Sequence, residues 1–252
     1  MQGRIFESTG VKLRSLLLFN LIASLVYVSA YGITITNIIT VSVMYFLYMC
    51  IGMVCTFHRF YSHKSFEFKN KFTRYFCTTL GLLSGSGSVF GWCGIHNKHH
   101  DKHDTPEDPH DSEKGFLNLI TLNYNYSIEM RYVKYLFKDK FLMMTHKYYY
   151  LMILMYVGIL SMLFGLEGVI FMFCAPSAIN VMVQGIGTYF LHKDGIPRYV
   201  NWFNWFVFGD ANHDEHHKDV KKYKLKHYDI SGWVIHNLLK LEKDNGTESA
   251  LR

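Results

Sequence analysis

Two long stretches of the chain contain almost no charge, and they constrain the fold more than any other feature. Residues 15–57 include no Asp, Glu, Lys, Arg or His, and residues 148–191 include one charged residue, Glu167. A membrane-spanning helix needs about 20 apolar residues, so each stretch is long enough for two spans joined by a turn. A single buried helix over either stretch would exceed about 60 Å, which is too long for a globule of 252 residues.

The two stretches therefore predict two helical hairpins and four transmembrane helices. We expect turns near Tyr31-Gly32 and at residues 165–168, where the sequence is Gly-Leu-Glu-Gly. The start of the first stretch resembles a signal peptide, but a second apolar span follows at once, so we expect an uncleaved first helix. Residues 75–95 are also uncharged but contain five Gly, a poor helix interior. This segment is expected to lie at the membrane interface or to re-enter the membrane.

The distribution of positive charge predicts the orientation. Of the 26 Lys and Arg residues, 3 precede the first stretch, 13 fall in residues 58–147 and 10 in residues 192–252, while the two turns have none. Lys and Arg accumulate in cytoplasmic loops. We therefore expect one domain over residues 1–252, with hairpins at about 15–57 and 148–191 and cytosolic regions at 58–147 and 192–252. No recognised motif accompanies the basic residues, which argues against a nucleic-acid partner.

Histidine is the second unusual feature, because most of the 14 residues fall in three clusters. On a helix, residues three and four apart share a face, so each HxxHH cluster can reach two neighbouring metal ions. Neutral imidazole is the commonest metal ligand, and eight of them would serve a two-metal site. The clusters are His58-Arg-Phe-Tyr-Ser-His63, His96-Asn-Lys-His99-His100 and His213-Asp-Glu-His216-His217.

The hairpins would bring these clusters to one membrane face. The first cluster follows the first hairpin, the second lies in the connecting region, and the third follows the second hairpin. Nearby carboxylates could offset the metal charge or orient the imidazoles; the candidates are Asp101, Asp104, Asp210, Asp214 and Glu215. We interpret the isolated histidines as ordinary polar side chains; these are His103, His110, His146, His227 and His236.

The joint pattern HRFYSH, HNKHH and HDEHH resembles the three histidine boxes of the membrane-bound fatty acid desaturases, and is most similar to their delta-9 (stearoyl-CoA desaturase-like) branch. The resemblance covers roughly residues 35–242. Further matches are Gly52, Trp92, Asp108-Pro109-His110 followed by Gly115-Phe116, and Gly209-Asp210. The resemblance implies an all-α membrane protein, with four transmembrane helices capped by a cytosolic helical di-iron domain.

The implied reaction removes two hydrogens from a long-chain acyl group, at the delta-9 position, using O₂ and two external electrons. Trp92 matches a family residue at the bend of the acyl tunnel beside the metals, and is a candidate substrate-binding residue. Carried over position by position, one iron ion would take His58, His63, His96, His100 and His216, and the other His99, His213 and His217.

The family has a ninth histidine ligand at the end of the last span, and two residues compete for it here. Counting back from His213 at the family's spacing leads to Gln184, whereas the local motif His192-Lys-Asp-Gly-Ile-Pro leads to His192. Gln184 would lie about 12 Å deeper along the helix, and imidazole suits such a site better than an amide oxygen. We favour His192. This choice puts Thr188 where the family usually has Asn, and Asp214 also replaces an Asn of the third box.

The resemblance also implies partners. No haem-binding His-Pro-Gly-Gly occurs in the sequence, so a separate electron donor such as cytochrome b5 or ferredoxin is expected. The acyl substrate could be carried by CoA, acyl carrier protein (ACP) or a membrane lipid. We expect a multi-pass protein of a bacterial inner membrane or the endoplasmic reticulum, with its His boxes facing the cytoplasm.

Two other functions stay open. The nearer is a membrane di-iron fatty acid or alkane hydroxylase, which would share the His boxes. The other is a metal transporter, which would hold its ligands near the middle of the membrane.

Overall fold

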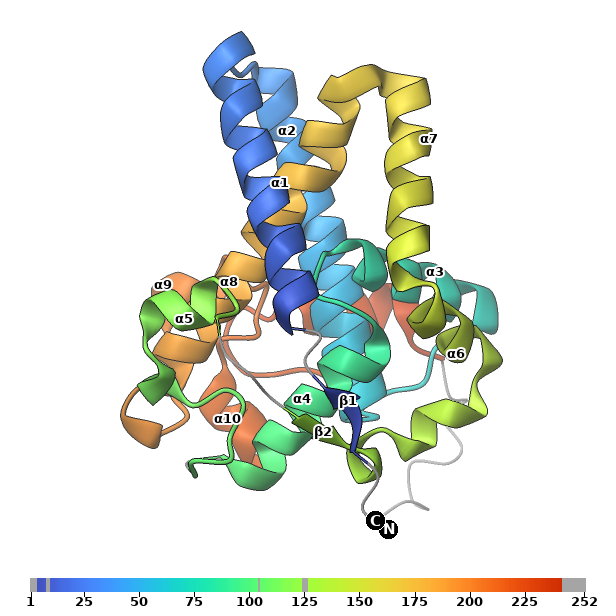
Figure 1. Cartoon of the computed structure of the whole chain (residues 1–252). Helices are drawn as coiled ribbons and strands as arrows, with labels where there is room; N and C mark the ends of the chain where they lie inside the picture. Colours follow the sequence, from blue (N-terminus) through green and yellow to red (C-terminus); the bar gives the residue numbers. More distant parts are fainter. Residues whose placement is uncertain (1–3, 8–9, 104, 124–126, 242–252) are drawn as a thin grey trace.

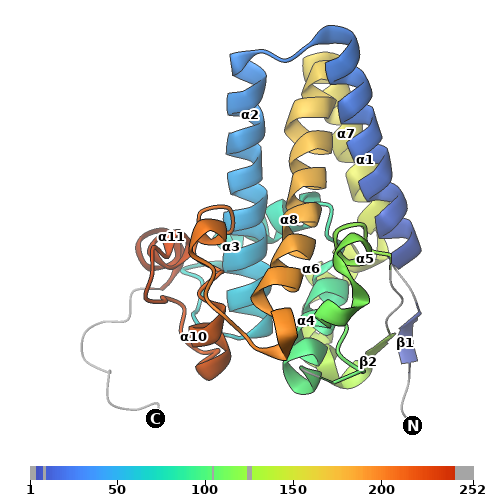
Figure 2. The same ribbon diagram turned by 90° about the vertical axis from the view of Figure 1, so that its left-hand side faces the viewer.

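The computed structural model describes residues 4–7, 10–103, 105–123 and 127–241, and this part of the chain is mostly helical. Figures 1 and 2 show long helices side by side, with shorter elements gathered at one end of them. In chain order the elements are β1 (Arg4–Glu7), α1 (Gly10–Tyr31), α2 (Ile35–Tyr45), η1 (Phe46–Ser62), α3 (Lys71–Leu83), α4 (Val89–Lys102), η2 (Ser112–Lys114), α5 (Phe116–Ile120), β2 (Ser127–Glu129), η3 (Met130–Tyr132), η4 (Lys134–Lys138), α6 (Lys140–Lys147), α7 (Tyr149–Val169), η5 (Ile170–Cys174), α8 (Ala175–Leu191), η6 (Lys193–Gly195), α9 (Asn201–Asn204), α10 (His213–Lys218), α11 (Ile230–Val234) and η7 (Ile235–Leu239).

Three helices of the described chain are long and apolar enough to cross a membrane: Lys12–Tyr31, Ile35–Ser62 and Tyr149–Leu191. The longest of them is interrupted at Gly165, whose φ of 65° and ψ of −163° are not helical. A positive φ is accessible to glycine because it lacks a Cβ atom. Figure 1 shows the chain reversing beyond α7, so that α8 runs back toward the end at which α7 began.

The turns of the two apolar stretches are bonded to each other. α1 ends at Tyr31, and the side chain of Thr34 caps α2 by accepting a hydrogen bond from the backbone N–H of Asn37. The Asn37 amide then donates to Glu167 Oε1 over 2.6 Å. Placing a carboxylate in an apolar environment is costly unless it is hydrogen-bonded. The one charged residue of the second stretch is thus bonded to the start of α2.

The helix that carries the first histidine cluster changes its winding. α2 continues directly into η1, a π-helix of 17 residues. Two side-chain hydroxyl groups also bond the carbonyl five residues earlier in the chain. Thr56 Oγ1 donates to the carbonyl of Ile51, and Ser62 Oγ donates to that of Phe57. π-Helices are rare and often occur at functional sites. Sequence reasoning considered only α-helical spacing, and therefore missed this feature.

Residues 75–95 form two short helices rather than a span. α3 has 13 residues and α4 has 14, and both fall short of the roughly 20 that a crossing needs. α3 packs tightly on η1, since a Cβ atom added to Gly52 would lie 2.4 Å from the backbone nitrogen of Gly81. The expectation that this segment does not cross the membrane agrees with these lengths.

One small feature departs from the all-helical expectation. β1 and β2 form a two-stranded antiparallel sheet, in which Arg4 pairs with Glu129 and Phe6 with Ile128. Ile128 is buried, and its side chain occupies the space that a Cβ atom of Gly94 would need. The sheet therefore joins the N-terminal segment to the helix that carries the second histidine cluster.

The close approach of Gly52 and Gly81 leads to a first prediction. Gly52→Ala should destabilise the protein by about 1–3 kcal/mol, because overpacking forces neighbouring backbone apart. Gly158→Ala is the matched control, since a Cβ atom there would meet nothing within 4 Å. Thermal melting of the two purified variants in detergent measures the difference. Equal melting temperatures would show that the α3–η1 contact is not close-packed.

Candidate metal centre

The π-helix places both histidines of the first cluster on one side. In a π-helix the backbone bonds join residues five apart, and the N–H of His63 donates to the carbonyl of His58 over 3.2 Å. The two ring centroids are 4.9 Å apart. The His-x₄-His spacing thus becomes a pair of neighbouring imidazoles, which α-helical winding would not produce.

The other two clusters lie on the α-helices α4 and α10, where spacings of three and four residues share a face. These helices meet η1 at one end of the long helices (Figures 1 and 2). His58 Nε2 is 3.0 Å from His216 Nε2, and His63 Nε2 is 2.8 Å from His96 Nε2. Three segments far apart in the sequence therefore direct their ring nitrogens at one another.

Nine histidines form two groups, and within each group the candidate ligand atoms lie within 4.8 Å of one another. The eight histidines of the three clusters are all included, and His192 is the ninth. We name the groups by size. The five-His group is His58, His63, His96, His100 and His216, and the four-His group is His99, His192, His213 and His217.

His192 and Gln184 lie in different surroundings. His192 Nε2 is 2.5 Å from His213 Nε2. Gln184 is in neither group: its Oε1 accepts from the indole N–H of Trp92 over 2.8 Å, and its Nε2 donates to Ser86 Oγ over 2.7 Å. The Thr188 hydroxyl donates to the backbone carbonyl of Gln184. Both polar ends of the Gln184 amide are thus already bonded.

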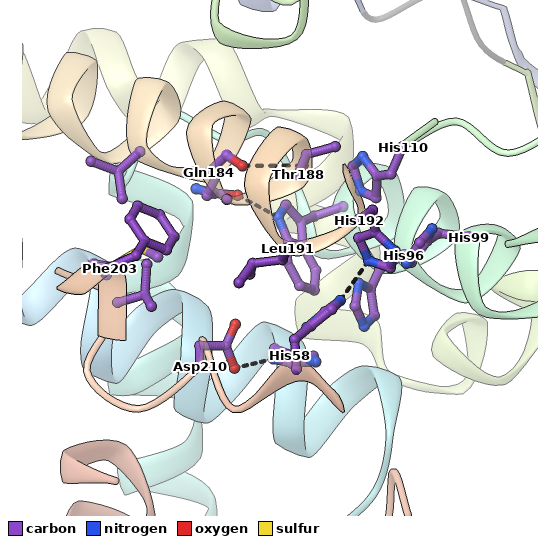
Figure 3. Close-up of a pocket in the computed structure, with 16 residues that line it drawn as sticks. His58, His96, His99, His110, Gln184, Thr188, Leu191, His192, Phe203 and Asp210 are labelled. Atoms are coloured by element: carbon purple, nitrogen blue, oxygen red, sulfur yellow. Dashed lines mark hydrogen bonds and ion pairs between the residues drawn. The ribbon is translucent and has the colours of Figure 1, made fainter. Parts of the chain in front are cut away.

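Two aspartates orient a histidine in each group. His58 Nδ1 is 2.8 Å from Asp210 Oδ1, and His99 Nδ1 is 2.9 Å from Asp108 Oδ1. A ring nitrogen that donates to a carboxylate leaves the opposite nitrogen with a free lone pair. Both histidines would therefore present Nε2 as a ligand atom (Figure 3 shows the Asp210–His58 contact).

Asp210 was one of five carboxylates suggested by the sequence, whereas Asp108 was missed. Its only signal was its place in the Asp108-Pro109-His110 match. The other candidates bond elsewhere. Asp101 accepts from Tyr132 and Arg131, Asp214 lies near Lys218, and Glu215 bonds Lys222 and the backbone of Lys226; Asp104 lies outside the described residues.

Histidines of both groups are kept neutral by their surroundings. Burial, followed by repulsion from the other imidazoles, lowers the pKa of His100 to about 2, that of His192 to about 3 and that of His217 to about 4. The same causes hold the pKa values of His63, His96, His99, His213 and His216 well below their usual value. At neutral pH these rings are uncharged, which is the form that binds metal ions.

The donor atoms fit a metal centre. His99 Nε2 is buried with no hydrogen-bond partner in the described chain, although its Nδ1 contacts Asp108. Leaving a buried polar atom unpaired costs about 1–3 kcal/mol. A metal ion would supply the missing partner. Imidazole sets of this kind suit zinc, copper, iron and nickel.

An apolar cavity adjoins the histidines. One part of its wall is formed by histidines of both groups, and another by the apolar residues Met49, Val183, Leu191, Phe203 and Val207. Figure 3 shows Phe203 on the opposite side of the view from His99, with Leu191 between them. An apolar ligand in this cavity would lie against histidines of both groups.

Trp92 stands between this cavity and a second one. Its ring stacks on His96, with centroids 4.9 Å apart and planes at 16°. Trp92, Gln184 and Thr188 line both cavities. The second cavity is otherwise largely apolar, with Leu13, Ile95, Leu119, Leu122 and Val181 in its wall. The Trp92–Gln184 hydrogen bond therefore lies where the two cavities meet.

His110 was interpreted as an ordinary polar residue, but it lies beside the centre. Its ring is 5.2 Å from that of His99, and it lines both cavities. Burial lowers its pKa to about 4. The isolated His146 and His236 instead bond Ser88 and Tyr223, away from the histidine groups.

Comparison with known proteins gives a consistent result. A family model described as fatty acid desaturase matches residues 35–221. The chain is 29% identical over 201 residues to an sn-1 stearoyl-lipid 9-desaturase of Synechocystis sp., covering 73% of this chain and 61% of the relative. It is 28% identical over 207 residues to an sn-1 stearoyl-lipid 9-desaturase of Anabaena variabilis, covering 76% and 74%.

A third relative is the Delta-9 acyl-lipid desaturase 1 of Arabidopsis thaliana, which is 30% identical over 182 residues. That match covers 66% of this chain and 59% of the relative. The chain thus spans about three fifths of the length of the Synechocystis and Arabidopsis proteins.

The Asp210–His58 contact leads to the second prediction. Asp210→Asn should lower the affinity for a divalent transition metal by about 10–100-fold, because a removed carboxylate no longer fixes the ring and its proton. Asp214→Asn is the matched control, since among the described residues Asp214 makes only a 3.9 Å ion pair with Lys218. Titration against a chromogenic chelator measures both affinities. Equal losses in the two variants would contradict the orienting role.

Proposed function

Because the chain belongs to the fatty acid desaturase family, we propose that it introduces a double bond into a long-chain acyl group. The proposed position is delta-9, and the proposed site is a centre of two iron ions that uses O₂. One observation carries the proposal: two groups of buried histidine nitrogens adjoin an apolar cavity. The names of the relatives support the delta-9 position.

The two histidine groups are the proposed iron sites. The first iron ion would be held by the five-His group and the second by the four-His group, in which His192 is the ninth ligand. The unpaired His99 Nε2 supports this assignment, and so do the uncharged rings. When bound, the two iron ions would supply the activation of O₂ that is needed to remove hydrogen from unactivated methylenes.

The cavity residues would position the substrate. Each methylene buried against Met49, Leu191 or Phe203 contributes about 0.8 kcal/mol, so an acyl chain can bind without polar contacts. We propose that Trp92 contacts the chain where the two cavities meet, because its ring stacks on His96 and its indole is held by Gln184. The length of acyl chain that extends past Trp92 would decide which carbon–carbon bond lies beside the histidines.

We propose four membrane crossings in two hairpins, with the histidine groups on the cytoplasmic side. The break at Gly165 supports two crossings within Tyr149–Leu191. The basic residues flank the hairpins on the same side as the three clusters, as cytoplasmic loops do. The ligands would then lie at the ends of the spans, which argues against a transporter with a site at mid-membrane.

The proposed partners are an acyl substrate and a separate electron donor such as cytochrome b5 or ferredoxin. The relatives are named for acyl chains carried by a lipid, by CoA or by ACP, so all three carriers are candidates. Assays with the same acyl chain on each carrier would distinguish the three.

The third prediction tests the reaction. Expression in a host that lacks its own desaturase should produce monounsaturated acyl chains, and the purified protein should contain close to two iron ions per chain. His216→Ala should abolish the product because it removes a ligand of the five-His group. Fatty-acid mass spectrometry and elemental analysis measure these results.

His236→Ala is the control for this experiment, since His236 bonds Tyr223 and belongs to neither histidine group. Hydroxylated products would instead assign the chain to the hydroxylases. Unchanged lipids, despite full iron loading and a competent donor, would contradict the proposed reaction.

The fourth prediction concerns the ninth ligand. His192→Ala should reduce the bound iron toward one ion per chain and strongly reduce turnover, whereas Gln184→Ala should retain both ions. The reason is that Gln184 is bonded to Trp92 and Ser86, while His192 faces His213. Full iron content in His192→Ala, with iron loss in Gln184→Ala, would assign the ligand to Gln184.

A further inference from the structure

A third cavity, separate from the two beside the histidines, lies between α3 and α6, and its lining is basic. Four cationic side chains, Lys71, Arg74, Lys138 and Lys140, line it together with one carboxylate, Asp139. Arg74 donates to Asp139 over 2.8 Å. The three lysines are exposed and form no ion pair with any described residue. The cavity therefore carries a net positive charge and suits an anion.

The cavity lies close to where the chain would enter the membrane. α6 ends at Lys147, and the apolar helix Tyr149–Leu191 begins two residues later. α3 is packed on the long helix Ile35–Ser62 through Gly81. Figure 1 shows α3 and α6 beside the end of α7 at which α7 begins. The basic residues would thus lie at the level of the lipid headgroups on the cytoplasmic side.

Exposed apolar side chains flank the basic ones on the same two helices. Phe72 is 81% exposed and Phe76 is 55% exposed, and residues four apart share one face of a helix. Met143 and Met144 on α6 are also exposed. Helices that combine an apolar face with Lys and Arg typically lie in the membrane interface.

We propose that this cavity binds the phosphate headgroup of an anionic phospholipid, with the lipid chains against Phe72 and Phe76. The stacked rings of Tyr75 and Phe141, 4.3 Å apart, form part of the wall. The cavity shares no lining residue with the two cavities beside the histidines. The site is therefore separate from the proposed acyl site, and its lipid is not the one that reacts.

The exposed phenylalanines favour a lipid over a soluble partner. An acidic protein would be attracted by the lysines alone and would have no use for apolar side chains directed at the bilayer. Each Lys or Arg near an anionic leaflet strengthens association, and the effect falls off within a Debye length. Three unpaired lysines around one cavity would concentrate that attraction on a single headgroup.

The test measures lipid retention by native mass spectrometry of the full chain. Phosphatidylglycerol and phosphatidylcholine with identical acyl chains are compared at physiological ionic strength. The wild type should retain phosphatidylglycerol preferentially. The triple variant K71Q/K138Q/K140Q should lose that preference by about 100-fold, while phosphatidylcholine retention stays unchanged. The readout needs neither iron nor turnover, so its failure would leave the proposed reaction untouched.

Two controls make the result specific. K218Q/K224Q/K226Q removes the same charge from the segment after the third cluster and should keep the preference. Phe72→Ser should weaken retention without changing charge, and it tests the site even if the triple variant folds poorly. Displacement of the lipid by an equal concentration of inorganic phosphate would overturn the proposal. An equal loss of the lipid preference in both lysine triple variants would also overturn it. So would a K71Q/K138Q/K140Q variant that loses binding to an acidic ferredoxin but keeps its lipid retention.

Discussion

The centre depends on burying neutral imidazoles with their lone pairs facing one another. A ring that carried a charge, or that kept its proton on the inner nitrogen, would offer no lone pair to a metal ion. Burial favours the neutral form by lowering the pKa, as at His100. Asp210 and Asp108 favour the required tautomer by accepting from Nδ1 of His58 and His99. The neutral form and the required tautomer both depend on close packing that excludes water from the rings. The short helices that pack against the ends of the long ones provide this packing.

One long helix carries the first histidine cluster, and the short helices α4 and α10 bring the other two clusters to it. η1 turns a spacing of five residues into adjacent rings, because its backbone is wound as a π-helix. The Gly52–Gly81 contact holds α3 against η1. At the opposite end, the hydrogen bond from Asn37 to Glu167 joins the two apolar stretches. The Asn37–Glu167 bond thus joins the two hairpins at the end away from the histidine groups, and the Gly52–Gly81 contact fixes α3 beside the helix that carries the first cluster.

Sequence periodicity predicted the parts of this structure that follow from local spacing. The uncharged lengths indicated the long helices, the glycines at 32 and 165 indicated where they end, and the HxxHH clusters indicated neighbouring imidazoles on α4 and α10. Asp108 could not be found in this way, since its contact with His99 depends on how residues 103–111 fold back. The π-helix was missed as well: the five-residue spacing of His58 and His63 matches its winding, but it was interpreted with α-helical periodicity alone. The bonding of Gln184 to Trp92 and Ser86 also required the packed structure.

Arg59 shows how charge is distributed around the centre. It is 1% exposed, and it donates to Asp229 over 2.9 Å and to the carbonyl of Tyr223 over 2.6 Å. A buried cation next to His58 would repel metal ions if it were unpaired. Asp229 neutralises it and also accepts from the backbone of Leu225 and Gly232.

Asp210 is 4.0 Å from Arg59 but only 2.8 Å from His58. The two carboxylates therefore have different roles. Losing Asp229 would leave the buried Arg59 without its nearest charged partner, which typically costs about 3–5 kcal/mol. The loss would therefore destabilise the folded protein. Losing Asp210 would leave Arg59 paired, so its effect would fall on His58 and on the affinity of the histidine groups for a metal ion.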